Sequence, residues 1–150
     1  MRILKSFGAA LCALTALALI ATATPARAQG PSYLQALADL RTARDYIQSD
    51  SRPEYDRERH HALDEIDKAI DEIKHAAWDD GKNTKYAPPA AGVTDPRQPM
   101  RMAANWLADA LKQVNSTPDQ PANRGLQERA TQHIVEARHT VGTVIQMAGH

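Results

Sequence analysis

Cysteine is almost absent from this 150-residue chain, and the single one, Cys12, lies in an apolar run near the start. Without a second thiol the chain cannot form an internal disulfide, a zinc site built from cysteines or a c-type haem attachment. We also expect the segment that carries Cys12 to be removed, which would exclude cysteine-based catalysis. The fold must therefore depend on burial of an apolar core.

The chain also lacks a hydrophobic run long enough to cross a membrane. The longest, from Phe7 to Ala21, is shorter than the roughly 20 residues that a bilayer span needs. Two basic residues precede it, and Ala26-Arg27-Ala28 supplies the small-x-small pattern that signal peptidase cuts. We therefore expect residues 1–28 to be a cleaved signal peptide. The mature protein, 29–150, would then be exported and not integrated in the membrane: periplasmic in a Gram-negative source, secreted otherwise.

Neither sign of charge is in excess, because the formal net charge at pH 7 is +0. No basic stripe of the kind that binds nucleic acid is present. Acidic residues outnumber basic ones from Ser32 to Lys82, whereas basic residues are in slight excess from Asn83 to His150. Two interpretations stay open: the halves attract each other within one domain, or the asymmetry steers a partner.

No segment alternates apolar and polar residues for long enough to form a sheet. Apolar residues instead recur at the three- and four-residue spacing of amphipathic helices. The sequence therefore predicts an all-α fold with helices at about 32–49, 52–80, 98–115 and 122–148.

Two local signals mark the ends of the second helix. Ser51-Arg52-Pro53-Glu54 matches a capping box with proline in the first turn, and Gly81 can end the helix because glycine tolerates positive φ. The following segment, 82–97, is rich in proline and resists helix, so it predicts an exposed crossover.

The two halves of the mature chain share a pattern of core residues. With Ala43 aligned to Ala110, Leu40 falls on Leu107, and after a one-residue slip Ile66 falls on Ile134. This indicates either an internal duplication or the coincidence of two amphipathic hairpins. In both cases neither αα-hairpin can bury its apolar face alone, so we predict one four-helix bundle at 29–150 built from two similar hairpins. The crossover leaves the direction of the second hairpin open, and we favour an up-down-up-down order.

The direction of a side chain on its helix decides whether it can be an inward metal ligand. Glu72 with His75, and Glu136 with His139, have the Glu-x-x-His spacing of di-iron bundles, but a step of about 100° per residue turns both pairs away from the apolar stripes. His133, at the edge of its stripe, is the one weak candidate for a metal or haem ligand. No cofactor is expected, and no catalytic set is visible.

Two tryptophans and a tyrosine lie off the centres of the predicted stripes. Trp78 ends the second helix, Tyr86 lies in the crossover and Trp106 lies in the third helix. Large rings at a boundary either cover the core or form a patch for a partner, and both readings stay open.

The runs LRTARDYIQ, ALDEIDKAIDEIKHAAWDDGKN and LQERATQHIVEAR resemble a family of small, uncharacterised, exported bacterial helical-bundle proteins. The resemblance extends from about Tyr33 to about Val144 and implies a helical bundle and export, but no activity, cofactor or catalytic residue.

These features favour a soluble, exported, non-enzymatic binding or interaction protein whose partner is an envelope protein or a small ligand. A periplasmic metal or haem carrier is one alternative, and an envelope-stress or chaperone-like protein is another.

Overall fold

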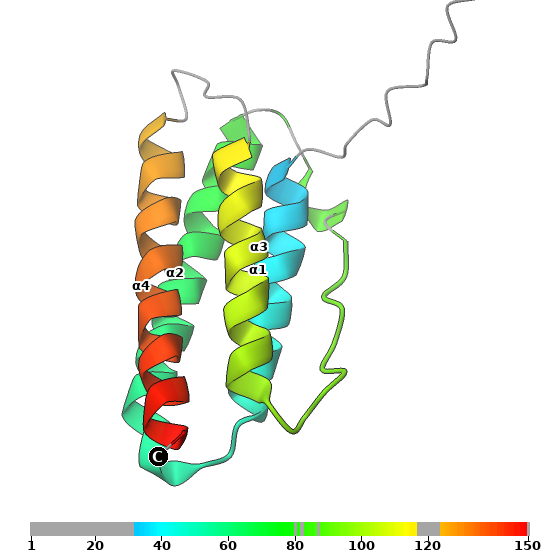
Figure 1. Ribbon diagram of the computed structural model, residues 1–150. Coiled ribbons are helices and arrows are strands. Elements are labelled where there is room, and N and C mark those ends of the chain that lie inside the picture. Colours follow the sequence, from blue (N-terminus) through cyan, green and yellow to red (C-terminus); the bar gives the residue numbers. More distant parts are fainter. Residues whose placement is uncertain (1–31, 80, 82, 87, 117–123, 150) are drawn as a thin grey trace, which may run out of the picture.

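Four α-helices make up most of the computed structural model, which describes residues 32–79, 81, 83–86, 88–116 and 124–149 (Figure 1). This part of the chain contains no strand, so the all-α prediction is confirmed there. The predicted signal peptide, 1–28, lies outside the described residues. The elements are α1 (Ser32–Ser49), the 3₁₀ turn η1 (Pro53–Tyr55), α2 (Asp56–Asp79), the 3₁₀ turn η2 (Thr84–Tyr86), α3 (Pro99–Ser116) and α4 (Arg124–Ala148).

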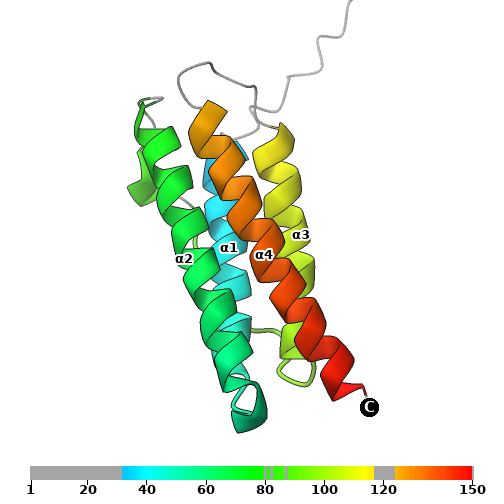
Figure 2. The same cartoon turned by 90° about the vertical axis from the view of Figure 1, so that its left-hand side faces the viewer.

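The helices pack side by side around one core. The main contacts join α1 to α3 and α2 to α4, with smaller ones between α3 and α4 and between α1 and α2 (Figures 1 and 2). Around the bundle the order is therefore α1, α2, α4, α3, which makes α2 and α3 diagonal neighbours.

The predicted up-down-up-down order is wrong. In Figure 1 α1 descends, α2 and α3 both ascend, and α4 descends, so α2 and α3 run parallel. The connection between them returns along the outside of α1 before α3 begins at the end where α1 finishes. The connection is long enough to run the length of α1, because an extended chain covers about 3.3 Å per residue, whereas a helix rises only about 1.5 Å per residue.

Two side chains of α1 hold the crossover against that helix. The backbone N–H of Ala91 donates to Thr42 Oγ1 at 2.8 Å, and that of Thr94 donates to the Tyr46 hydroxyl at 2.8 Å. Tyr46 also shares a 2.7 Å hydrogen bond with the Thr94 hydroxyl. Tyr46 and Thr42 are buried because the crossover covers the outer face of α1.

The predicted apolar stripes supply the core. Aligned positions of the two hairpins are all buried: Leu40, Ala43, Ile47, Ala62, Ile66, Ala69 and Ile73, with Leu107, Ala110, Val114, Ala130, Ile134, Ala137 and Val141. Each helix packs mainly against its counterpart in the other hairpin, so the two apolar faces close on each other. Duplication as the origin of this pattern stays a prediction.

The sequence predicted the end of α2 correctly but not its start. Gly81 has φ +67°, and its N–H donates to the carbonyl of Trp78 at 2.9 Å, as expected of a helix-ending glycine. The capping box is not formed: a 3₁₀ turn precedes α2, with Arg52 at its N-cap and no side-chain cap. Asp50 instead accepts the Arg52 N–H at 3.1 Å, since the proline places the turn ahead of the helix.

One carboxylate lies within the apolar face of α1. Asp39 is buried, accepts a 2.9 Å hydrogen bond from Gln35 and has no ion pair within the described residues. Burial raises the pKa of Asp39 above its ordinary value, and the nearby charge of Asp109 adds to this rise against the Gln35 hydrogen bond.

Replacing His75 by alanine is expected to change the free energy of unfolding by less than about 0.5 kcal/mol, because the side chain is exposed on α2. Chemical denaturation of the two proteins measures the difference. A loss of several kcal/mol would mean that the outer face of α2 is covered.

Candidate functional site

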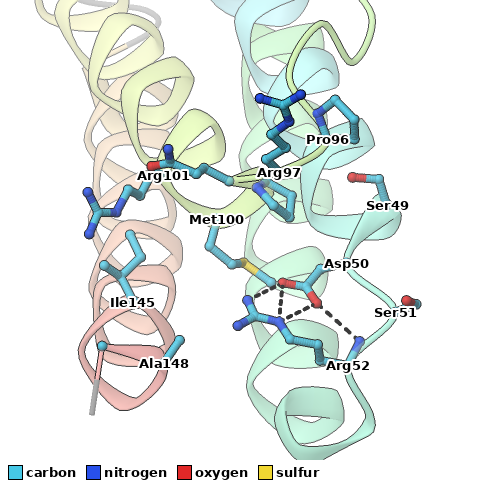
Figure 3. Close-up of a pocket in the computed structure, with 13 residues that line it drawn as sticks. Ser49, Asp50, Ser51, Arg52, Pro96, Arg97, Met100, Arg101, Ile145 and Ala148 are labelled. Carbon is cyan, nitrogen blue, oxygen red and sulfur yellow. Dashed lines mark hydrogen bonds and ion pairs between the residues drawn. The ribbon is translucent and has the colours of Figure 1, made fainter.

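A cavity of about 590 Å³ opens at the end of the bundle where α1 and α4 finish and α3 begins (Figure 3). A volume of this size is typical of sites for small ligands. Four segments distant in the sequence line it: Ser49 to Arg52, Pro96 to Arg101, Ile145, and Ala148 with Gly149. The parallel course of α2 and α3 brings these segments together.

One wall of the cavity is a fixed turn between α1 and α2. Asp50 is buried, and its carboxylate accepts the Nε–H of Arg52 at 2.9 Å and also a hydrogen bond from Nη2. The Arg52 hydrogen bonds lower the pKa of Asp50 despite its burial. Arg52 also lies 4.6 Å from the centre of the Tyr55 ring, and Arg59 donates to the Asp50 carbonyl. The turn is thus braced on several sides.

The opposite wall is the start of α3. Pro99 is the first helical residue, and the first turn contains no acidic side chain. Arg97 and Arg101 flank it, both exposed, and neither guanidinium has an ion pair or hydrogen bond within the described residues. A helix start carries partial positive charge, so this wall is electropositive.

The floor of the cavity is apolar. Met100 is buried and points between the two walls in Figure 3, and Ile145 faces it from α4. The described lining residues include no histidine, and the Ser49 hydroxyl donates to the Tyr46 carbonyl at 2.7 Å. The lining thus offers hydrogen-bond donors and apolar contact, with no serine–histidine pair for nucleophilic chemistry.

His133, the weak metal candidate, lies between α2 and α4. Its Nδ1 is 2.6 Å from Glu65 Oε2, and Lys68 donates to the other oxygen of Glu65 at 2.8 Å. Burial favours a raised pKa for Glu65, but the hydrogen bonds from Lys68 and His133 outweigh it, so the pKa is lowered. His133 is half-buried as predicted, and its imidazole is engaged in an interhelical bond.

The Glu-x-x-His pairs lie on the outer faces of α2 and α4, as their spacing predicts. His75, Glu136 and His139 are exposed, and Glu72 pairs with Arg129 at 2.8 Å. Among the described residues no three His, Cys, Asp or Glu side chains are grouped so as to hold a metal ion. No helix in the described part of the chain is long and apolar enough to cross a membrane.

The three aromatic residues of the possible patch lie on α2, on η2 and on α3. Trp78 is 77% exposed at the end of α2, beside a hollow of about 380 Å³ formed with the residues that lead into η2. Trp106 is half-buried on α3, the diagonal helix, and packs against the core. Its buried indole N–H has no hydrogen-bond partner within the described residues. Tyr86 lies in η2, near Trp78 in the chain.

Comparison with protein-family models, with curated proteins and with solved structures found no match in any of the three. The resemblance to small exported bacterial bundles stays a prediction.

Sequence reasoning missed the cavity, although one signal of it is present. Arg97 and Arg101 flank a proline at a helix start that has no carboxylate, a pattern that leaves positive charge unpaired. The sequence alone does not show that α3 begins beside Asp50 and Arg52, so it could not predict that the turn carrying these two residues forms the other wall of the cavity.

Proposed function

We propose that this protein is a non-enzymatic binding protein that takes a small ligand into the cavity at the start of α3. The proposal includes export of the chain after removal of residues 1–28 and a bundle of two similar hairpins. It rests on one observation: a cavity of about 590 Å³ with a braced turn on one side and unpaired arginines on the other.

The rest of the molecule supports this choice. Elsewhere along the described helices the apolar side chains pack together in one buried cluster. The bond from His133 Nδ1 to Glu65 leaves Nε2 of His133 as a potential ligand. A metal carrier nevertheless gains no support, because among the described residues no three His, Cys, Asp or Glu side chains are grouped to hold an ion. A chaperone-like role would need an open apolar face, and the exposed large apolar residues are scattered: Trp78, Val93, Val135 and Met147.

An envelope protein as partner is the second candidate, favoured by the exposure of Trp78. A Trp78→Ser variant separates the two functions, because ligand binding in the cavity should be unchanged by it.

The test is a screen of small metabolites by nuclear magnetic resonance with wild-type protein and an Ala148→Trp variant. Ala148 is exposed and lines the cavity, so a tryptophan there should fill it without disturbing the core. Gln146→Trp is the matched control, because Gln146 is exposed on the same helix but does not line the cavity.

A ligand should shift the amide signals of residues 49–52 and 96–101 in wild-type protein and in the control, and lose its affinity in Ala148→Trp. Equal affinity in all three proteins, or no ligand at all, would contradict the proposal.

A further inference from the structure

We propose that the ligand of this cavity is a small oxyanion, a carboxylate or phosphate compound, bound by Arg97 and Arg101. This inference rests on the proposed function of the cavity and names the class of compound that it takes.

Arg97 and Arg101 bring two positive charges, unpaired within the described part of the chain, to one cavity. Several other arginines of the bundle pair with carboxylates, such as Arg52 with Asp50 and Arg129 with Glu72 at 2.8 Å. Arg41 and Arg138 have no ion pair within the described residues either, but neither of them lines the cavity. Arg97 and Arg101 have no such partner within the described residues, although both line the same cavity. Two unpaired guanidinium groups beside one cavity repel each other, and an anion between them removes that repulsion.

The charged groups near this wall have partners of different kinds. Asp50 is bound by Arg52, and Asp95 accepts the backbone N–H of Arg97 at 3.0 Å. The start of α3 adds partial positive charge and has no acidic residue in its first turn. The ends of α1 and α4 contribute partial negative charge to the other sides of the cavity, and the backbone N–H does not neutralise Asp95. The positive charge is therefore confined to the α3 wall, at the two guanidinium groups and the helix start.

The side chains of Arg97, Arg101 and Arg52 are placed so that each could reach a ligand in the cavity. In Figure 3 the Arg97 guanidinium lies toward Pro96 and that of Arg101 toward α4. Both side chains are exposed, so they can rotate toward the cavity within nanoseconds. Arg52 uses Nε and Nη2 for Asp50, which leaves its Nη1 as a further donor on the braced wall. The buried Met100 suits a ligand with a short apolar stem.

The experiment titrates the full chain with matched probes at low ionic strength and follows amide shifts. Succinate and succinamide share one skeleton but differ in charge, 1,4-diaminobutane carries the opposite charge, and inorganic phosphate separates phosphate from carboxylate ligands. We expect the anions to bind, with affinity that falls as salt is added, and the neutral and cationic probes to bind at least about tenfold more weakly.

Arg97→Gln and Arg101→Gln should each weaken anion binding about fivefold to tenfold, because each removes charge-assisted hydrogen bonds. Lys112→Gln is the matched control: it removes one positive charge from an exposed position of α3 at the far end and should leave binding unchanged. Circular dichroism verifies that all three variants fold.

Outcomes separate this inference from the proposed function. Equal binding of succinate and succinamide at the cavity would overturn the anion class and leave a binding site. If neither anion binds at millimolar concentration, the anion class is also overturned. The metabolite screen tests separately whether the cavity binds any small ligand. Anion binding that Lys112→Gln weakens as much as Arg101→Gln does would show attraction by net charge, and would overturn the assignment to these arginines.

Discussion

Replacing Ile66 by aspartate should unfold the protein. Ile66 is fully buried on α2, in the core formed with Ile134 of α4. Losing such a side chain costs about 2 to 5 kcal/mol, and a buried carboxylate without a partner adds its desolvation. The total stability of a domain of this size is about 5 to 15 kcal/mol, so the substitution removes most or all of it.

Far-ultraviolet circular dichroism and urea denaturation measure this effect. Ile66→Val is the matched control, because it keeps an apolar side chain at the same site and should cost only about 0.5 to 1.5 kcal/mol. Ile134→Asp should behave as Ile66→Asp does. A cooperative transition near the wild-type midpoint in either aspartate variant would show that these faces are not in the core.

Replacing Arg52 by alanine should destabilise the protein by about 2 to 3 kcal/mol at neutral pH, because it leaves the carboxylate of Asp50 buried without a cation. The side chain of Asp50 is 2% exposed, whereas that of Arg52 is 39% exposed, which places the effect below that of a fully buried pair. The double variant Asp50→Asn with Arg52→Ala should recover part of the loss, because the amide is neutral and its oxygen can still accept the backbone N–H at position 52.

The same pair predicts a dependence on pH. Arg52 holds the pKa of Asp50 below its unfolded value, so the stabilisation is present above about pH 4 and is lost as pH falls through the lower, folded pKa. Without Arg52, burial is the main influence left and favours the neutral acid. The stabilities of wild-type and Arg52→Ala protein should therefore converge below about pH 4. A constant difference from neutral to acidic pH would contradict the ion pair.

The sequence predicted those features that depend on local pattern. All four helices were placed within a few residues, since each carries an apolar stripe at helical spacing, and the glycine stop at Gly81 was foreseen. His133 lies at the edge of a stripe and is half-buried, as the spacing implied. These features required only the geometry of one helix.

The predictions that were wrong or incomplete concern how segments distant in the sequence are arranged in space. The order of the helices was wrong because a long crossover permits either direction of the second hairpin, and the burial of Tyr46 and Thr42 was missed because it comes from that crossover. Trp78 and Trp106 lie on the diagonal helices α2 and α3, a separation that the spacing of residues along one helix does not give; a patch with Tyr86 stays a prediction. The candidate cavity could not be foreseen for the same reason: its walls meet only when α3 begins beside Asp50.

The most direct test of the arrangement that creates the cavity is a pair of distances between spin labels, in a chain with Cys12 replaced by serine. Labels at His75 and Arg101 should lie on the order of 30 Å apart, because parallel α2 and α3 put these positions near opposite ends of the bundle. Labels at His75 and Asn115 should lie within about 15 to 20 Å, since both positions are near the same end. The reverse order, with Arg101 close to His75 and Asn115 far from it, would mean an up-down-up-down bundle without this cavity.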